Sequence, residues 1–479
     1  MRRIRGLWLR FWERMRRMKY EEFLRRKEHH VISSGFSKDR KEMNDKMFAW
    51  QKDIVFWALK KGRAALFEDC GLGKTIQQLE WAQSVSEHTE RPVLIVAPLA
   101  VAEQTKREGE KFGYCVTVCR SMSDVSAGVN ITNYEMLDHF TAESFGGVVL
   151  DESSILKNFT SKTRTQIIDL FRETEYKLSC TATPSPNDYM ELGNQAEFLG
   201  VMSRTEMLAT FFIHDGANTS KWRLKGHAED KFWGWLAEWA VVLTSPADLG
   251  YPADEYILPE MHTHEHLVEV HQETMNDNLT LFTEVAQTLS ERREARRNSL
   301  KERCEKAAEL VKTDSGQWLV WCDLNDESET LTKLIDDAVE IRGSDKPRDK
   351  AERLRRFTDG EIRVLVTKPS IAGFGLNWQG CHNMIFVGLS DSYEMMYQAI
   401  RRCYRFGQEN TVNVHIVTSA AEGAVKANVE RKERQCAEMT AEMVKHTKEI
   451  LEEEIRGTVR IVIPYNPQVE MKIPEWLTT

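Results

Sequence analysis

Short apolar runs with the composition of β-strands alternate with helix-like segments over two stretches of this chain. From Phe48 to about Leu199 the runs are AALF at 64, VLIVAPL at 93, VVLDE at 148 and YKLSCTATP at 176. After residue 316 they are QWLVWCDL, IRVLVTK, HNMIFVGL and TVNVHIV. Such alternation predicts a parallel sheet with helices on both faces. Because the pattern occurs twice, we expect two similar α/β domains.

The chain divides into five expected segments. Its 479 residues exceed what a single hydrophobic core sustains. Between the two stretches of alternating strand-like and helix-like segments, the strand pattern is lost. The basic sequence AQTLSERREARRNSLKERCEKAAELV there predicts a helical insertion. The expected segments are a basic N-terminal arm and lead-in (1–44), a first domain (45–200), the insertion (201–315), a second domain (316–425) and a C-terminal helix and tail (426–479). In the tail, RGTVRIVIPYNP predicts a closing strand.

Charge is distributed unevenly along the chain. The net charge is −9, yet residues 1–30 hold eleven Lys or Arg and four Asp or Glu, a local balance of +7 that leaves −16 elsewhere. Affinity for phosphate depends on local clusters of Lys and Arg, so the net charge does not exclude a nucleic-acid groove. Residues 1–17 form a basic arm ahead of MKYEEFL, which has the pattern of a domain start. We therefore expect the arm to be dispensable for chemistry.

Hydropathy and cysteine usage indicate a soluble chain in a reducing compartment. No run approaches the ~18 apolar residues of a membrane span. The nine Cys include no C-x-x-C pair, and Cys180 and Cys322 lie in apolar runs, which predicts buried thiols and a cytoplasmic location. A metal site is an alternative interpretation of a few Cys and His residues. We favour instead that the cysteines are buried thiols and that the alternating histidines lie on the exposed side of a strand. The candidate ligands of a metal site are Cys115, Cys119, His262, His264 and His266.

The segment AALFEDCGLGKTIQQLEWA follows a strand and opens a helix, which is the context of a phosphate-binding loop. Gly71 and Gly73 would let backbone N–H groups approach phosphate oxygens. Lys74 would reach the β and γ phosphates, and Thr75 would offer its hydroxyl to Mg²⁺. A strict G-x-x-x-x-G-K-T loop has Gly where this chain has Glu68, so a glycine-rich turn stays open as the alternative.

A pair of acids follows the apolar strand in VVLDESS. If this strand lies beside the loop, Asp151 would hold the metal and Glu152 would orient or deprotonate the attacking water. An Asp-Glu pair after a strand is otherwise a solvated strand end. Its place after the loop favours the catalytic interpretation.

Two arginines lie three residues apart in QAIRRCYRFGQ of the second domain. On a helix, Arg402 and Arg405 would share one face and could enter the cleft between the domains. The planar guanidinium suits developing charge on phosphate oxygens. We interpret both as arginine fingers, in preference to a basic surface helix.

In order and composition, these motifs resemble those of superfamily 2 helicases, from Gln51 to Gln408. The string D-C-G-L-G-K-T is similar to the D-E-x-G-L-G-K-T of Swi/Snf-type motors, in which Gly is also absent at position 68. APLAVAEQ and ITNYEML resemble strand-contacting motifs, DESS the D-E-x-x box, LSCTATPSPND the coupling motif, and VLVTKPSIAGFGLN and QAIRRCYRFGQ the motifs of the second domain. Small phage or prophage-encoded DEAD/DEAH-type helicases look similar here. The sequence departs from the pattern at Ser153-Ser154 and at Arg401, where an Asp is common.

The resemblance implies two tandem RecA-like domains that bind ATP and Mg²⁺ between them and nucleic acid across their joint surface. It implies nucleotide contacts for Gln51, Gly373 and Gln398. It implies a coupling role for Thr181 and Thr183. The implied nucleic-acid contacts are Thr132, Asn133, Lys368 and Asn377.

Two further features have competing interpretations. The basic residues Arg292, Arg293, Arg296, Arg297, Lys301 and Arg303 could form a duplex clamp or a solvated helix face balanced by Glu291, Glu294 and Glu302. A group of tryptophans could stack single-stranded bases, but the i, i+4 spacing of Trp235 and Trp239 favours a buried face. The group comprises Trp222, Trp233, Trp235 and Trp239.

We therefore expect a nucleic-acid-stimulated ATPase that translocates on double-stranded DNA as a monomer, in the cytoplasm of a bacterial or phage-infected cell. One alternative is a DNA-binding remodelling scaffold that uses ATP mainly as a conformational ligand; Lys74, Asp151, Glu152, Arg402 and Arg405 argue against it. Another is a P-loop phosphotransferase that needs only the first domain, which the second set of motifs disfavours.

Overall fold

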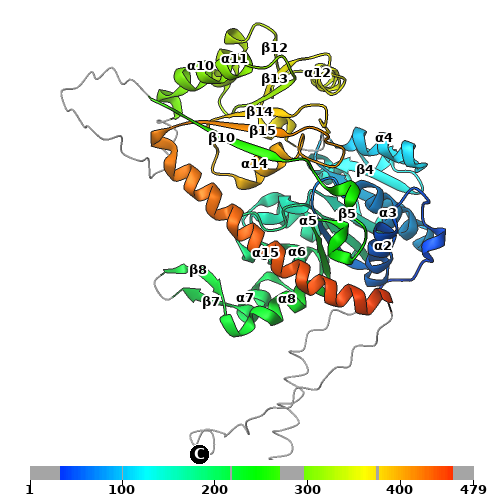
Figure 1. Cartoon of the computed structure of the whole chain (residues 1–479). Helices are drawn as coiled ribbons and strands as arrows, with labels where there is room; N and C mark the ends of the chain where they lie inside the picture. Colours follow the sequence, from blue (N-terminus) through cyan, green and yellow to red (C-terminus); the bar gives the residue numbers. More distant parts are fainter. Residues whose placement is uncertain (1–32, 100, 216–217, 270–295, 374–376, 457–479) are drawn as a thin grey trace, which may run out of the picture.

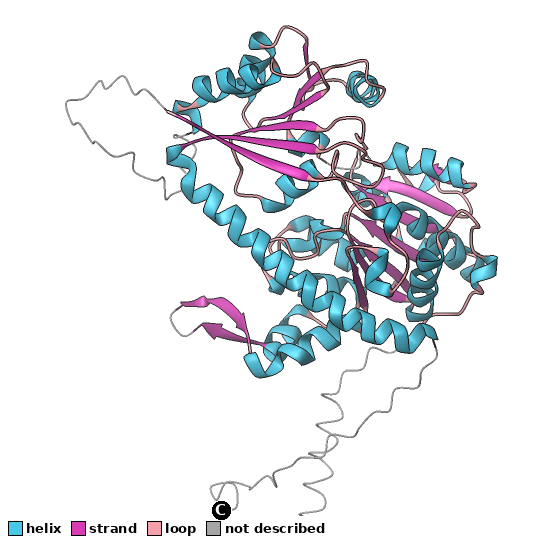
Figure 2. Cartoon of the chain, in the orientation of Figure 1, coloured by secondary structure: helices cyan, strands magenta, loops and turns pink. Residues whose placement is uncertain are grey.

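The computed structural model describes residues 33–99, 101–215, 218–269, 296–373 and 377–456. These residues form two α/β domains joined by a linker and by one long C-terminal helix (Figure 1). Figure 2 shows that each domain has a central sheet covered by helices. The predicted architecture of two parallel-sheet domains is confirmed.

The first domain is built on a seven-stranded sheet in the order β3-β4-β2-β5-β6-β1-β9, with every neighbouring pair parallel. Its central strands are apolar along their whole length because both faces are covered. The strands are β1 (Arg63–Glu68), β2 (Val93–Ala97), β3 (Val116–Val118), β4 (Val129–Asn133), β5 (Gly147–Asp151), β6 (Tyr176–Cys180) and β9 (Ala240–Leu243). The helices are α2 (Ala49–Lys61), α3 (Lys74–Thr89), α4 (Ala102–Phe112), α5 (Lys162–Leu170), α6 (Leu192–Leu199), α7 (Arg204–Phe211) and α8 (Glu229–Ala237).

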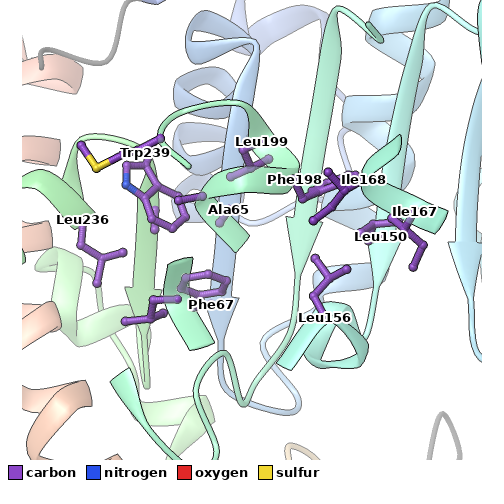
Figure 3. Packing of buried hydrophobic residues seen from close by; sticks show 14 of the residues in the cluster. Ala65, Phe67, Leu150, Leu156, Ile167, Ile168, Phe198, Leu199, Leu236 and Trp239 are labelled. Carbon is purple, nitrogen blue, oxygen red and sulfur yellow. The ribbon is translucent and has the colours of Figure 1, made fainter. Parts of the chain in front are cut away.

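Two hydrophobic clusters fill the two faces of this sheet. Alternate residues of β1 divide between them: Ala64 and Leu66 pack under α2, α3 and α4, while Ala65 and Phe67 pack under α5 to α8. Figure 3 shows Phe67 and Trp239 within the second of these clusters. Trp233, Trp235 and Trp239 are all buried there. The interpretation of these tryptophans as core residues is confirmed.

The second domain is a six-stranded parallel sheet in the order β10-β15-β14-β11-β13-β12. The strands are β10 (Met261–Val268), β11 (Trp318–Trp321), β12 (Ala338–Glu340), β13 (Val364–Thr367), β14 (Asn383–Val387) and β15 (Val412–Ser419). The helices are α10 (Leu300–Val311), α11 (Asn325–Leu334), α12 (Pro347–Thr358), α13 (Pro369–Ala372) and α14 (Tyr393–Ile400). One face of the sheet packs on α10 and α11, and the other on α12, α13 and α14.

The expected helical insertion at 201–315 is wrong in part. Besides α7, α8 and α10 it holds the antiparallel hairpin of β7 (Phe212–Asp215) and β8 (Asn218–Leu224). It also gives β9 to the first sheet and β10 to the second. The sequence did not predict these strands. β9 has only four residues, and β10, with the sequence MHTHEHLV, is mostly exposed at the edge of its sheet.

The charged helix predicted near the C-terminus is confirmed as α15 (Gly423–Arg456), which links the two domains. Figure 1 shows it as the long orange helix that leaves the second sheet and runs along the first domain. Lys432 donates to the backbone oxygen of Asp391 in the second domain. Farther along, Met439 and Met443 are buried in the core of the first domain. The predicted closing strand and the basic arm of residues 1–17 lie outside the described residues.

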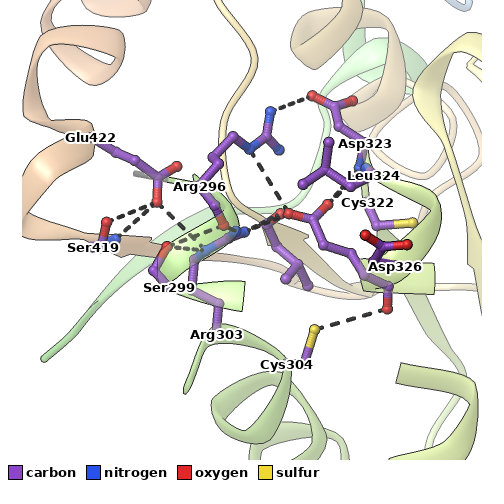
Figure 4. Close-up of polar contacts among 12 residues, drawn as sticks. Arg296, Ser299, Arg303, Cys304, Cys322, Asp323, Leu324, Asp326, Ser419 and Glu422 are labelled. Carbon is purple, nitrogen blue, oxygen red and sulfur yellow. Dashed lines mark hydrogen bonds and ion pairs between the residues drawn. The ribbon is translucent and has the colours of Figure 1, made fainter. Parts of the chain in front are cut away.

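The basic segment of the insertion is an internal ion network in the second domain, which contradicts a duplex clamp for two of its arginines. Arg303 is fully buried and pairs with Glu327 at 2.8 Å and with Glu422 at 3.5 Å. Arg296 donates to Asp323 at 2.7 Å. Figure 4 shows this network, in which α10 is joined to α11 and to the segment after β15. Arg292 and Arg293 lie outside the described residues.

Candidate active site

The loop between β1 and α3 has a backbone that only glycine accommodates. Gly71 and Gly73 have φ angles of 92° and 79°, in the left-handed region. A Cβ on Gly73 would lie 2.5 Å from the side-chain nitrogen of Gln51, and one on Gly71 would lie 3.0 Å from the backbone nitrogen of Phe406. The loop ends at the N-terminus of α3, where free N–H groups favour an anion.

Lys74, Thr75 and Gln51 are gathered at this loop, as predicted. Nζ of Lys74 donates to the backbone oxygens of Glu68 and Asp69 at 2.8 and 3.1 Å. Thr75 is the second residue of α3. Gln51 donates from Nε2 to the backbone oxygen of Leu72 at 2.9 Å. The cationic group of Lys74 is thus held inside the loop, where a phosphate would be bound.

The acidic pair lies beside the loop at the end of β5. Oδ1 of Asp151 accepts from the amide of Gln78 on α3 at 2.8 Å. Glu152 has a φ of 53°, a left-handed conformation that is strained for a non-glycine residue. Burial raises the pKa of Asp151, and burial together with the charge of Asp151 raises the pKa of Glu152 to about 7. A divalent cation would relieve both effects.

Arg402 and Arg405 reach this cleft from the second domain, but not from one helix. α14 ends at Ile400, so the expectation of a shared helical face is wrong, and both arginines sit in the turns that follow. Arg402 is buried and donates from Nε to the backbone oxygen of Gln398 at 3.0 Å. Arg405 hydrogen-bonds the side chain of Asn377. Both lie close enough to Glu152 for their charges to act on its carboxylate.

Buried polar atoms of Gln398 and Glu152 lack hydrogen-bond partners among the described residues. The side-chain nitrogen and oxygen of Gln398 are both buried with no hydrogen bond among the described residues, and so is Oε2 of Glu152. Buried polar groups are ordinarily satisfied. The glycine loop and Lys74 fit the phosphates of a nucleoside triphosphate with Mg²⁺, and the free oxygen of Glu152 can accept from a water molecule beside them.

Direct contacts join the two domains across the cleft. Arg401 forms an ion pair with Asp69 of the loop, which also accepts from the hydroxyl of Tyr397. Glu394 of α14 pairs with Lys157 and accepts from the hydroxyl of Thr183 at 3.4 Å. Sequence patterns missed Asp69, Tyr397 and Glu394. The single acid within the apolar run YEMMYQAI was the available signal.

Thr181 and Thr183 lie directly after β6, whose last residue Cys180 pairs with Asp151 of β5. Both are buried, and the backbone N–H of Thr183 donates to the hydroxyl of Thr181 at 3.1 Å. Thr183 is the one that contacts the second domain, through Glu394. This placement suits the predicted coupling role, which stays a prediction.

The predicted nucleic-acid residues have different environments. Thr132 is 1% exposed, its hydroxyl has no hydrogen-bond partner among the described residues, and its role as a direct contact stays a prediction. Asn133 is half-buried at the end of β4. Lys368 is half-buried after β13 and donates to Asn325 at 2.7 Å. Asn377 is engaged with Arg405, at the cleft.

Gly373, a predicted nucleotide contact, closes the short helix α13. Its N–H donates to the backbone oxygen of Pro369 at 2.8 Å. The following residues 374–376 lie outside the described part of the chain, so its role stays a prediction.

The described residues hold no group of three or more His, Cys, Asp or Glu placed to bind a metal ion. His264 hydrogen-bonds Asn413, and His266 hydrogen-bonds His415, both on the face that β10 shares with β15. In the same described part of the chain, no helix is both long and apolar enough to cross a membrane.

Comparison with known protein families identifies both domains. Residues 50–212 match the SNF2-related domain, and residues 302–407 match the helicase conserved C-terminal domain. The chain carries an SNF2-type helicase core. The resemblance to the Swi/Snf-like branch of superfamily 2 is thereby confirmed.

Individual relatives of this SNF2-type core are distant. The DNA annealing helicase and endonuclease ZRANB3 of Bos taurus is 23% identical, over 78% of this chain and 38% of that protein. The SWI/SNF-related matrix-associated actin-dependent regulator of chromatin subfamily A-like protein 1 of Xenopus laevis is 24% identical, over 78% of this chain and 42% of that protein. The chain thus spans less than half the length of these relatives.

Among solved structures, the Sulfolobus solfataricus SWI2/SNF2 ATPase core in complex with dsDNA aligns with 88% of this chain and 99% of its own. The sequence identity is 17% and the TM-score is 0.41.

Proposed function

We propose that this SNF2-type core hydrolyses ATP and uses the energy to translocate on double-stranded DNA. The observation that carries the proposal is that the loop holding Lys74, with Asp151 and Glu152 beside it, faces Arg405 of the second domain, whose Cβ would lie 3.7 Å from a Cβ built on Gly71. A site completed by both domains couples each round of hydrolysis to their relative motion.

Each residue has a defined task in this proposal. Lys74 binds the β and γ phosphates, and Glu152 orients or deprotonates the attacking water. Arg402 and Arg405 stabilise the charge that develops on the transferred phosphoryl group. Thr75 and Asp151 would hold Mg²⁺, which supplies charge neutralisation when it is bound.

We propose duplex DNA as the nucleic acid on which the protein moves, because its sequence motifs resemble those of Swi/Snf-type motors. One relative is also named as a DNA annealing helicase. Asn133 is the last residue of β4 and Lys368 follows β13, so both lie at the carboxyl ends of parallel strands, and both are proposed contacts to the DNA backbone. We further propose that the chain acts as a monomer on DNA in a bacterial or phage-infected cell.

The test is ATP hydrolysis measured without nucleic acid and with duplex DNA, single-stranded DNA or RNA. Duplex DNA should stimulate hydrolysis most, and DNA affinity should fall steeply with salt while varying little with base sequence. Stimulation by RNA alone would contradict the proposed track. ATP binding without hydrolysis under all four conditions would favour the conformational scaffold.

A further inference from the structure

Glu394 belongs to α14 of the second domain, but its carboxylate is bound by side chains of the first. The side chain is 4% exposed. Oε2 forms an ion pair with Lys157, and Oε1 accepts from the hydroxyl of Thr183 at 3.4 Å. A buried carboxylate that lost these partners would be strongly destabilised. Because Lys157 and Thr183 belong to the first domain, both contacts exist only while the two domains face each other.

The first-domain partners of Glu394 flank the predicted base. Lys157 is the last residue of the 3-10 helix η5 (Ser153–Lys157), which begins directly after Glu152. Thr183 follows β6, the strand next to β5. One carboxylate from the second domain thus touches both the segment that follows β5, which begins directly after Glu152, and the segment that follows β6.

The strained backbone of Glu152 depends on how η5 is anchored. Residues hold a left-handed conformation only where the surrounding structure fixes them. Within the first domain, the side-chain nitrogen of Asn194 donates to the backbone oxygens of Leu156 and Lys157 at 2.8 and 3.1 Å. The second domain adds the ion pair between Lys157 and Glu394. η5 is therefore held from both sides of the cleft.

We propose that Glu394 is a positioning residue that places Glu152 for hydrolysis only when the second domain closes on the first. It acts through Lys157 and Thr183 and does not touch the nucleotide itself. The inference rests on the proposed ATPase function. It extends that function by naming the contact that forms when the domains close and that positions Glu152 for hydrolysis.

One substitution and one charge swap test this role. Glu394→Gln keeps the shape of the side chain and removes the charge that pairs with Lys157. Misplacing a catalytic group by ~1 Å lowers rates about 100-fold elsewhere, so DNA-saturated turnover should fall about tenfold or more. ATP affinity, measured with a fluorescent analogue, should stay within about threefold of wild type. The double variant Lys157→Glu with Glu394→Lys should recover turnover relative to either single charge change.

The matched control is Glu430→Gln, on an α15 side chain that is 47% exposed. Small-angle scattering of the nucleotide-free protein adds a readout independent of turnover: Glu394→Gln should have a larger radius of gyration, and the charge swap should restore the wild-type value. Turnover of Glu394→Gln equal to that of Glu430→Gln would overturn the inference.

Failure of the proposed function would look different. A wild-type chain that binds ATP but never hydrolyses it would overturn that function. The radius of gyration would then test the closure contact without any measurement of turnover. A larger radius for Glu394→Gln that returns to the wild-type value in the charge swap would support the contact. An unchanged radius for Glu394→Gln would overturn it.

Discussion

Arg401 at the end of α14 forms an ion pair with Asp69 of the phosphate-binding loop, across the cleft between the two domains. The two side chains are only 11% and 16% exposed. Arg401 stands where an Asp is common in the motif that this segment resembles, so the pairing is a property of this chain. It connects the nucleotide loop of one domain to the arginine-bearing segment of the other.

The coupling between these two side chains is measurable by a double-mutant cycle of Asp69→Asn and Arg401→Gln. Because the pair is largely buried, its interaction energy in urea unfolding should be about 0.5–3 kcal/mol. Strictly additive single effects would mean that the two charges do not interact in solution.

Arg405→Ala and Lys74→Ala should separate nucleotide binding from turnover. Lys74→Ala removes a ground-state phosphate contact, so both ATP affinity and hydrolysis should fall. Arg405→Ala should leave ATP affinity within a few-fold and lower DNA-saturated turnover by ~10³ or more, as arginine fingers do. The measurements are ATP binding and hydrolysis at saturating DNA.

Near wild-type turnover of Arg405→Ala would refute its assignment as a finger. A normal turnover that needs a higher DNA concentration would instead mark Arg405 as a DNA contact.

Met439 and Met443 anchor the long helix α15 in the core of the first domain. Met439→Ala or Met443→Ala should each lower the free energy of unfolding by about 2–5 kcal/mol, because each leaves a cavity where the helix crosses the domain. Lys445→Ala, on the exposed side of the same helix, is the control. Equal unfolding midpoints for Met443→Ala and Lys445→Ala would show that the helix does not pack there.

Lys177 gives the first domain a pH-dependent stability. Its side chain is 2% exposed and donates to the backbone oxygens of Arg172 and Phe198, and burial lowers its pKa from 10.5 to about 7. Between these two values the unfolded chain binds more protons than the folded chain, so folding stability rises with pH.

The unfolding free energy of the wild type relative to Lys177→Met should therefore increase from pH 7 to 9, by at most about 1.4 kcal/mol per pH unit. Urea unfolding at pH 6, 7.5 and 9 measures it. A constant difference across this range would mean that Lys177 stays protonated in the folded chain.

Much of the fold and the nucleotide site could be predicted from sequence because the signals are local. Strands such as β5 and β13 are buried on both faces and are therefore continuous apolar runs. The carboxyl ends of parallel strands meet at one edge of a sheet. That geometry brings Lys74 and Asp151 together once the order of the strands is known.

The features that could not be predicted from the sequence depend on contacts between segments that are far apart in the chain. The exposed, histidine-rich β10 has no apolar pattern, and only its pairing with β15 defines it as a strand. Arg303 has the sequence context of a basic surface helix, but Glu327 and Glu422 are brought to it by packing. The contacts of Glu394 and Arg401 exist only once two domains face each other.

The central claim, that ATP hydrolysis drives movement along duplex DNA, is tested most directly by displacement of a third strand from a DNA triplex. The wild-type chain should displace the strand only when ATP is present, and Lys74→Ala should not displace it. Duplex-stimulated hydrolysis with no displacement beyond the ATP-free level would contradict translocation.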